Sequence, residues 1–462
     1  MDKHTLWSLR LGFSARQSQL IQKKGIPAFL KQSFATKPDL SIPSFLDDSP
    51  KSFADLKEIR KTLKANNPDE IKEMVKKEIK VSIALKSWWI EKMRYEELPL
   101  REKMTVFWHN HYVATYQKVK VNHWIYQHNC LLREHAFGNF RELTKQVVQS
   151  NAMVRYLDNT GNRNGKINEN LSRELLELFT LGIGNYSEED IKNGAKGLAG
   201  LGLGDEHAIY RPIFEDNDTI TYLGKTGKFK VDALVDIIFD QSAAPYLLTR
   251  KILKWFIYDN PDENLVTYYG NYFREQDYEI KPLLVKIFTE EYAKDNAGSK
   301  IKDPLVYILQ LMDELHIEKP NTTLVSFFIK QQGMDLFNQP NVKGWNGGRE
   351  WLSTQVFVQR NNTADLLCNG KNLRRQQLGA VSEMGEINRP TINVRLDWDK
   401  NSNNKQVILD LQERLLFHTD TDLQSDCEKL LKYDFNPQSP NADNAVVRLF
   451  NFMVKTPEYQ LI

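Results

Sequence analysis

The sequence NENLSRELLELFTLG occupies residues 168–182 and combines the strongest helical period of the chain with many charges. Leu171, Leu175 and Phe179 recur at i, i+4 and i+8, which is the spacing of one face of an α-helix. A glycine such as Gly182 is a typical residue just after a helix end. We therefore predict an α-helix here with a buried apolar face, around which the rest of the chain is organised.

The same helix carries a second face of charged residues. Glu169, Arg173 and Glu177 follow one another at i, i+4 and i+8, and such a ladder in solvent stabilises a helix by only about 0.3 to 0.5 kcal/mol per pair. Glu174 flanks the leucine stripe, so its carboxylate is expected to be partly buried and to need a partner. A solvent-facing ladder and a buried polar network both fit this pattern, and the apolar neighbourhood favours the network.

Two histidines lie upstream in the largely apolar run 106–113, VFWHNHYV. His109 and His111 would point the same way on a strand, whereas on a helix they diverge by about 200°. A neighbouring helix that brings carboxylates such as Glu174 beside one of them would form a metal site of the kind found in helix bundles. The alternative is that His111 is a core histidine bonded to a backbone carbonyl, with His109 on a salt-bridged flank. The spacing matches no zinc signature.

Composition excludes several classes of protein. Lys plus Arg total 62 and Asp plus Glu total 60, so the net charge of +2 gives no field that attracts nucleic acid. No window approaches the roughly 20 apolar residues of a membrane span, and the first residues lack the apolar core of a signal peptide. The three cysteines are far apart in the sequence and none forms a C-x-x-C pair, which indicates reduced thiols. We expect a cytoplasmic protein.

Apolar residues recur at helical spacing along most of the chain, and no run of alternating residues is long enough for a principal sheet. The predicted fold class is all-α, with at most a small β-hairpin around residues 209–230. Ser187 and Asp190 are spaced as a helix-capping box. We predict a single helical unit over residues 1–462, divided into N-terminal helices at 1–95, a central core at 96–204, a helical region at 205–390 with a glycine- and tryptophan-rich loop at 339–351, and C-terminal helices at 391–462.

The loop at 341–348, NVKGWNGG, has two interpretations. Its backbone N–H groups are able to cradle an anion, but no G-K-[ST] follows a four-residue gap, so it is not a P-loop. Aromatic residues in a glycine-rich loop usually fix that loop to the core. We interpret it mainly as a loop that Trp345 pins in place.

Seven segments in order resemble the bacterial family catalogued as domain of unknown function 1800. They cover nearly the whole chain and are EKMTVFWHNH at 102–111, LREHAFGNF at 132–140, YLDN at 156–159, residues 168–184, YSEEDI at 186–191, QPNVKGW at 339–345 and KTPEYQL at 455–461. The resemblance implies a mostly helical protein, often encoded beside an exported sulfatase-like protein of the alkaline phosphatase superfamily. That neighbour is a candidate partner.

The chain departs from the family pattern in two places. The expected leucine-threonine-glycine-tryptophan is Leu198-Ala199-Gly200-Leu201 here. Where the family pattern has a histidine-aspartate pair and a later lysine, this chain has Glu215-Asp216 and Ile220. If those family residues belong to a site, this member has lost part of it.

The sequence leads to two functional hypotheses. In the first, the protein is a metal-dependent enzyme that acts on an anionic substrate. In this hypothesis His109, His111 and Glu174 hold a divalent or redox metal ion. The predicted catalytic residues are Arg173, Glu177 and His135. In the second, the protein is a non-catalytic binding or escort protein for the sulfatase-like neighbour, and leaves the cell on its partner's export signal.

Overall fold

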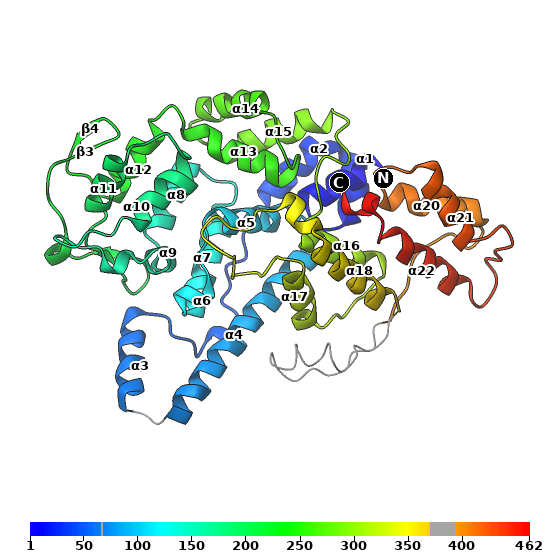
Figure 1. The fold of residues 1–462 in the computed structure, drawn as a ribbon, viewed down its shortest axis with the longest axis horizontal. Helices are drawn as coiled ribbons and strands as arrows, with labels where there is room; N and C mark the ends of the chain where they lie inside the picture. Colours follow the sequence, from blue (N-terminus) through cyan, green and yellow to red (C-terminus); the bar gives the residue numbers. More distant parts are fainter. Residues whose placement is uncertain (66–67, 370–392) are drawn as a thin grey trace.

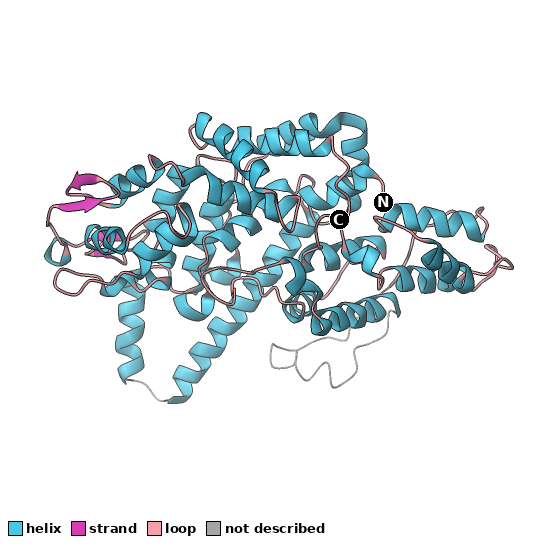
Figure 2. Cartoon of the chain, turned by 45° about the horizontal axis from the view of Figure 1, so that its top comes forward, coloured by secondary structure: helices cyan, strands magenta, loops and turns pink. Residues whose placement is uncertain are grey.

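Helices make up most of the chain in the computed structural model, which describes residues 1–65, 68–369 and 393–462 (Figures 1 and 2). The predicted all-α class is confirmed, because the only strands in this described part form two small antiparallel pairs. The buried apolar side chains form one hydrophobic cluster that runs from Leu6 to Ile462. The boundary predicted between residues 390 and 391 lies outside the described residues.

The elements follow one another in chain order. The N-terminal part contains α1 (Lys3–Leu11), η1 (Ala15–Gln17), α2 (Ser18–Ala35), η2 (Ser44–Leu46), α3 (Phe53–Ala65) and α4 (Pro68–Tyr95). The central part contains α5 (Leu100–His111), α6 (Tyr116–Val119), α7 (Asn122–Glu134), α8 (Phe140–Val148), α9 (Asn151–Tyr156), η3 (Asn159–Gly161), α10 (Asn170–Glu174), η4 (Leu175–Thr180) and α11 (Glu188–Gly197).

The second half begins with the short strands and returns to helices. It contains β1 (Leu201–Gly202), β2 (Ile209–Tyr210), η5 (Pro212–Phe214), β3 (Ile220–Tyr222), β4 (Lys225–Gly227), α12 (Val231–Phe239), α13 (Ala244–Phe256), α14 (Glu263–Glu275), α15 (Ile280–Tyr292), α16 (Pro304–Glu314), α17 (Thr322–Gln331), η6 (Gly348–Leu352), α18 (Thr354–Asn369), α20 (Asn404–Leu415), α21 (Thr421–Leu430), α22 (Ala442–Met453) and η7 (Pro457–Gln460).

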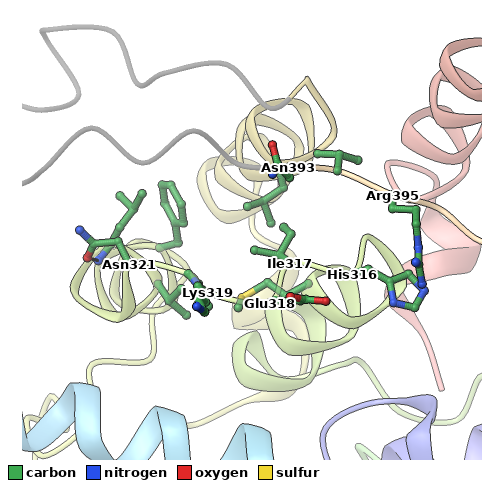
Figure 3. Close-up of a pocket in the computed structure, with 14 residues that line it drawn as sticks. His316, Ile317, Glu318, Lys319, Asn321, Asn393 and Arg395 are labelled. Carbon is green, nitrogen blue, oxygen red and sulfur yellow. Dashed lines mark hydrogen bonds between the residues drawn. The ribbon is translucent and has the colours of Figure 1, made fainter.

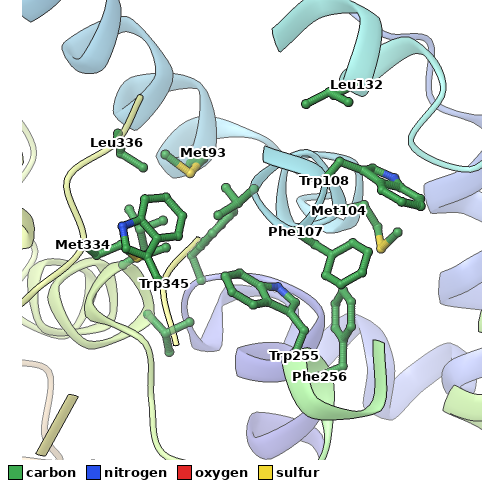
Figure 4. Close-up of a cluster of buried hydrophobic side chains, with 14 of the residues drawn as sticks. Met93, Met104, Phe107, Trp108, Leu132, Trp255, Phe256, Met334, Leu336 and Trp345 are labelled. Carbon is green, nitrogen blue, oxygen red and sulfur yellow. The ribbon is translucent and has the colours of Figure 1, made fainter. Parts of the chain in front are cut away.

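Helix α5 lies at the centre of this arrangement (Figure 1). Every residue of the helix except Asn110 is buried. The ring of Phe107 packs against those of Trp255 and Phe256 on α13, at centroid distances of 6.2 and 6.3 Å (Figure 4). Trp108 stacks on Phe140 of α8 at 5.9 Å. Because α5 is enclosed on several sides, the histidines at its C-terminal end have fixed surroundings.

Two buried ion pairs hold α5 to its neighbours. Glu102 accepts two hydrogen bonds from the guanidinium of Arg133 on α7, at 2.6 and 2.9 Å. The same carboxylate accepts from the indole N–H of Trp89 on α4 at 2.9 Å. The next residue, Lys103, donates to Asp303 at 2.8 Å. These charges are almost inaccessible to solvent, so each depends on its partner for compensation.

The predicted hairpin is present and is joined by a second strand pair. Strands β3 and β4 pair antiparallel, with Ile220 opposite Gly227, and turn through Leu223 and Gly224, which both have positive φ. Such a two-residue turn suits the twist of a hairpin. Strand β1 starts before the predicted range and pairs with β2. The predicted capping box is also present, because the Ser187 side chain accepts from the Asp190 backbone and the Asp190 side chain accepts from the Ser187 backbone.

The organising segment differs from the predicted regular α-helix. It is α-helical only over Asn170–Glu174 and then becomes a π-helix over Leu175–Thr180. An apolar period predicts which face is buried, but it cannot distinguish i−4 from i−5 hydrogen bonding over a few residues. The hydroxyl of Thr180 donates to the carbonyl of Leu175 at 2.6 Å within the wider turn. The wider turn changes which carbonyls are available to neighbouring side chains.

Candidate functional site

Two carbonyl groups of the π-helix accept hydrogen bonds from side chains of other helices. Lys251 on α13 donates to the carbonyl oxygen of Leu178 at 2.8 Å. Nε2 of His111, at the end of α5, lies 3.1 Å from the carbonyl oxygen of Phe179. Short π-helical segments frequently occur at functional sites because they free backbone groups in this way. The segment therefore joins the C-terminal end of α5 to the middle of α13.

Lys251 and His111 also form a pair with each other. A carbonyl oxygen only accepts, so Nε2 of His111 carries the proton and Nδ1 is left to accept from Nζ of Lys251, 3.1 Å away. Burial, and then the nearby lysine, holds the pKa of His111 well below its usual value, so the imidazole is neutral. Burial lowers the pKa of Lys251 to about 7. This amine therefore exchanges its proton near neutral pH.

The loop at 339–351 closes over the end of α5. The Asn110 side chain accepts from the backbone N–H of Trp345 at 2.6 Å and donates to the carbonyl of Trp345 at 3.2 Å. Gln339 donates to the carbonyl of His109 at 2.9 Å. Gly344 has a φ of +81°, and a Cβ there would meet Oδ1 of Asn110 at 2.2 Å. The predicted tryptophan-pinned loop is thus held by the asparagine between the two histidines.

Replacing Gly344 by alanine is expected to destabilise the protein by about 1 to 3 kcal/mol from backbone strain, with the clash against Asn110 added. The matched control is Gly184→Ala, since Gly184 has a φ of +86° but nothing within 4 Å of the added Cβ. Urea unfolding of both variants measures the difference. An equal loss in the two variants would contradict the close packing of the loop on α5.

A pocket of about 140 Å³ lies between the end of α5, α13 and this loop. Its charged lining groups are Lys251, Lys254, Lys300, Lys343 and Asp259. Lys300 donates to the carbonyl of Lys254 at 3.0 Å and lies 3.6 Å from Asp259. Burial lowers the pKa of Lys300 to about 8. Four amines and one carboxylate line the pocket, so its charge favours an anionic ligand. We call it the lysine-lined pocket.

Two tryptophans that line the same pocket have an indole N–H group without a partner. Trp255 and Trp345 are 8% and 5% exposed, and Nε1 of each has no hydrogen-bond acceptor within the described part of the chain (Figure 4). An indole N–H only donates, and a buried donor left unbonded costs about 1 to 3 kcal/mol.

Comparison with known proteins identifies the family. The family model described as a protein of unknown function (DUF1800) matches residues 4–461. The chain belongs to this family. No curated protein and no solved structure matches it. Among the helices of the described residues, none is both long and apolar enough to cross a membrane.

Six residues of this DUF1800 protein were predicted to form a site: His109, His111, His135, Arg173, Glu174 and Glu177. Within the described residues they make no hydrogen bond or ion pair with one another. The same part of the chain contains no group of three or more His, Cys, Asp or Glu that is arranged to hold a metal ion. His111 is the only one of the six that lines the lysine-lined pocket.

His109 points away from the Lys251–His111 pair, as expected because His109 and His111 are two residues apart on a helix. It is fully buried, and its ring packs against those of Trp89, His128 and Phe337 at centroid distances of 4.9, 5.1 and 5.2 Å. Burial first, then His128 and Arg133, holds its pKa well below the usual value. Neither ring nitrogen has a hydrogen-bond partner among the described residues.

The charged ladder on the organising helix faces solvent at Arg173. This residue pairs with Glu169 at 3.0 Å and with Glu188 at 2.9 Å, and its side chain is 35% exposed. Glu177 accepts from the hydroxyl of Tyr186 at 3.0 Å. The favoured buried network is therefore not formed by Arg173, because its two carboxylate partners, at the starts of α10 and α11, are 36% and 68% exposed.

Glu174 and His135 lie outside the pocket lining. Burial and the nearby Glu177 raise the pKa of Glu174, while Lys343 opposes the shift, so Glu174 lies close to one lysine of the pocket. Half-buried His135 caps the C-terminal end of α7, and its carbonyl accepts from the backbone of Gly138 at 3.0 Å. Its ring makes no hydrogen bond within the described residues.

The sequence analysis missed Lys251 and the other lysines. Lys251 follows Leu248 by three residues and precedes Trp255 by four, so it occupies a position on the apolar stripe of its helix. A lysine on such a stripe is rarely buried without a purpose, and this signal was available in the sequence. The departures from the family pattern at Leu201, Glu215 and Ile220 are not among the residues that line the pocket.

A larger pocket of about 390 Å³ lies at the end of α16 and the start of α17 (Figure 3). Its labelled polar residues include His316, whose Nε2 lies 2.7 Å from a carboxylate oxygen of Asp397. The histidine is thus already paired with a carboxylate. The pocket contains none of the motifs that carry the family resemblance, so the smaller lysine-lined pocket is the stronger candidate.

Proposed function

We propose that this DUF1800 protein binds a small anionic ligand, with a carboxylate, sulfate or phosphate group, in the lysine-lined pocket. We further propose that Lys251 and His111 transfer a proton to or from that ligand. The excess of four lysines over one carboxylate around the pocket carries the proposal.

The placement of the lysines assigns them different roles. The Lys254 and Lys343 side chains are exposed and make no hydrogen bond within the described part of the chain, so both are free to reach a ligand. Lys251 is partly buried and held by two acceptors. A general acid or base works best when its pKa lies near the working pH, and the pKa of Lys251 of about 7 meets this condition.

Sulfate is expected to stabilise the protein in a saturable way, by about 2.7 kcal/mol at a concentration 100 times its Kd. Thermal unfolding with sulfate, compared with chloride at equal ionic strength, measures this effect. Lys254→Met and Lys343→Met should each weaken binding about tenfold through the loss of one charged contact. Lys281→Met removes an exposed lysine of α15 that lies outside the pocket, and should bind like the wild type. Equal stabilisation by chloride and sulfate would contradict the proposal.

The metal ion stays a prediction. Its predicted ligands are His109, His111 and Glu174, and of these only His111 lines the lysine-lined pocket. Elemental analysis of protein expressed with added metals should find a bound metal in the wild type and less in Glu174→Gln. Metal-free wild type under these conditions would count against the prediction. The sulfatase-like partner also stays a prediction, which a pull-down from cells expressing both proteins would test.

A further inference from the structure

The Lys251 amine has one free tetrahedral position. Two hydrogen bonds, to the carbonyl of Leu178 at 2.8 Å and to Nδ1 of His111 at 3.1 Å, each use one proton. A neutral amine has two protons and one lone pair, so it keeps both hydrogen bonds and leaves only the lone pair unused. Lys251 lines the lysine-lined pocket. The neutral amine is therefore fully satisfied by the protein and has its lone pair free for a bound molecule.

The other amines of the pocket lack this arrangement. The amine of Lys300 donates to the carbonyl of Lys254 and forms an ion pair with Asp259. The Lys254 and Lys343 side chains are exposed to water and make no hydrogen bond within the described residues. Lys251 is held by a backbone carbonyl and an imidazole and makes no ion pair within the described residues, so nothing there compensates the charge of an ammonium group. One amine is thus suited to attack, while its neighbours are suited to bind an anion.

The size of the pocket limits the ligand. Its volume is about 140 Å³, which suits a small ligand. A 2-oxo carboxylate of the size of pyruvate has one anionic group for the lysines and one carbonyl group for an amine.

We propose that Nζ of Lys251 is a nucleophile that forms an imine with the carbonyl carbon of a small 2-oxo carboxylate held in the lysine-lined pocket. This inference rests on the proposed anion site. It adds the class of substrate and the identity of the reacting atom.

The step balances without any oxidant or reductant. The lone pair of Nζ forms a bond to the carbonyl carbon, and the π electrons move to the oxygen, which takes up one of the two protons of the nitrogen. Nδ1 of His111 accepts a proton from the nitrogen and returns it to the hydroxyl group, which leaves as water. Amine and carbonyl thus become imine and water. The carbonyl of Phe179 holds Nε2–H of His111 in place during this transfer.

Reductive trapping tests the inference. The wild-type protein is incubated with pyruvate and cyanoborohydride, and the modified residue is located by peptide mass spectrometry. The expected result is one reduced adduct, on Lys251, whose rate of formation rises between about pH 6 and 8 as the amine loses its proton. Lys251→Met should lose the adduct, and Lys281→Met should keep it. Mapping in the wild type is decisive even if Lys251→Met folds poorly.

Added sulfate separates the two proposals. Sulfate is expected to slow the labelling of Lys251 by competing for the pocket. If sulfate stabilises the protein but Lys251 is labelled no faster than Lys254 or Lys281, the imine inference is overturned and the anion site stands. If Lys251 is labelled selectively and sulfate neither protects it nor stabilises the protein, the anion site is overturned and the nucleophile stands.

Discussion

Arg133→Met is expected to destabilise the protein by about 3 to 5 kcal/mol, the usual cost of removing one partner of a buried ion pair. Arg133 is completely buried and donates twice to Glu102, which is 3% exposed. Without the arginine, the carboxylate on α5 keeps only the indole N–H of Trp89 as a partner. A buried charge with so little compensation is costly. Urea unfolding, followed by circular dichroism, measures the loss.

The chain offers a matched control on its surface. Arg250 makes the same two-bond contact with Glu263, at 2.9 and 2.5 Å, but the two side chains are 40% and 69% exposed. Arg250→Met should therefore cost no more than about 1 kcal/mol. Adding Glu102→Gln to Arg133→Met should recover part of the loss, because glutamine keeps an acceptor for Trp89 and has no charge. Similar losses in the free energy of unfolding for Arg133→Met and Arg250→Met would show that burial does not decide the cost of removing the ion pair.

Hydropathy patterns were enough to predict the fold class, because amphipathic helices and a short hairpin each give a periodic pattern of apolar residues in the sequence. The turn at Leu223-Gly224 and the Ser187 capping box depend on residues that are neighbours in sequence. The π-helix at Leu175–Thr180 could not be predicted in this way, because it is fixed by partners on α5 and α13 that are distant in sequence. Tertiary contacts decide such local departures from the regular helix.

The site was predicted less completely, for a related reason. The alternative interpretation of His111, as a core histidine bonded to a backbone carbonyl, is confirmed. The metal hypothesis placed His111 beside Glu174 as a ligand of the same ion, whereas in the structure Nδ1 of His111 lies 3.1 Å from Nζ of Lys251. Acidic residues on the organising helix were predicted to belong to the site because they are close together in the sequence. The four lysines of the pocket come from α13, the segment before α16 and the loop after α17, and no local pattern connects them.

The pH dependence of stability is the second large effect, and it comes from Lys251. A lysine in the unfolded chain keeps its proton up to a pKa of about 10.4, whereas burial lowers the pKa of Lys251 to about 7 in the folded protein. Between about pH 7 and 10 the unfolded state binds one more proton than the folded state. The free energy of unfolding therefore rises with pH across this window, by about 1.4 kcal/mol per pH unit for one proton.

Lys251→Met removes this proton, so its free energy of unfolding should rise less steeply than that of the wild type from about pH 7 to 10, by about 1.4 kcal/mol per pH unit. Urea unfolding at several pH values measures both slopes. Lys300, whose pKa is also lowered, contributes equally to both proteins and cancels in the difference. Lys281→Met should keep the wild-type slope, because Lys281 is exposed. If Lys251→Met kept that slope too, Lys251 would be charged in the folded protein throughout this range, and neither its proton transfer nor its nucleophilic attack at neutral pH would stand.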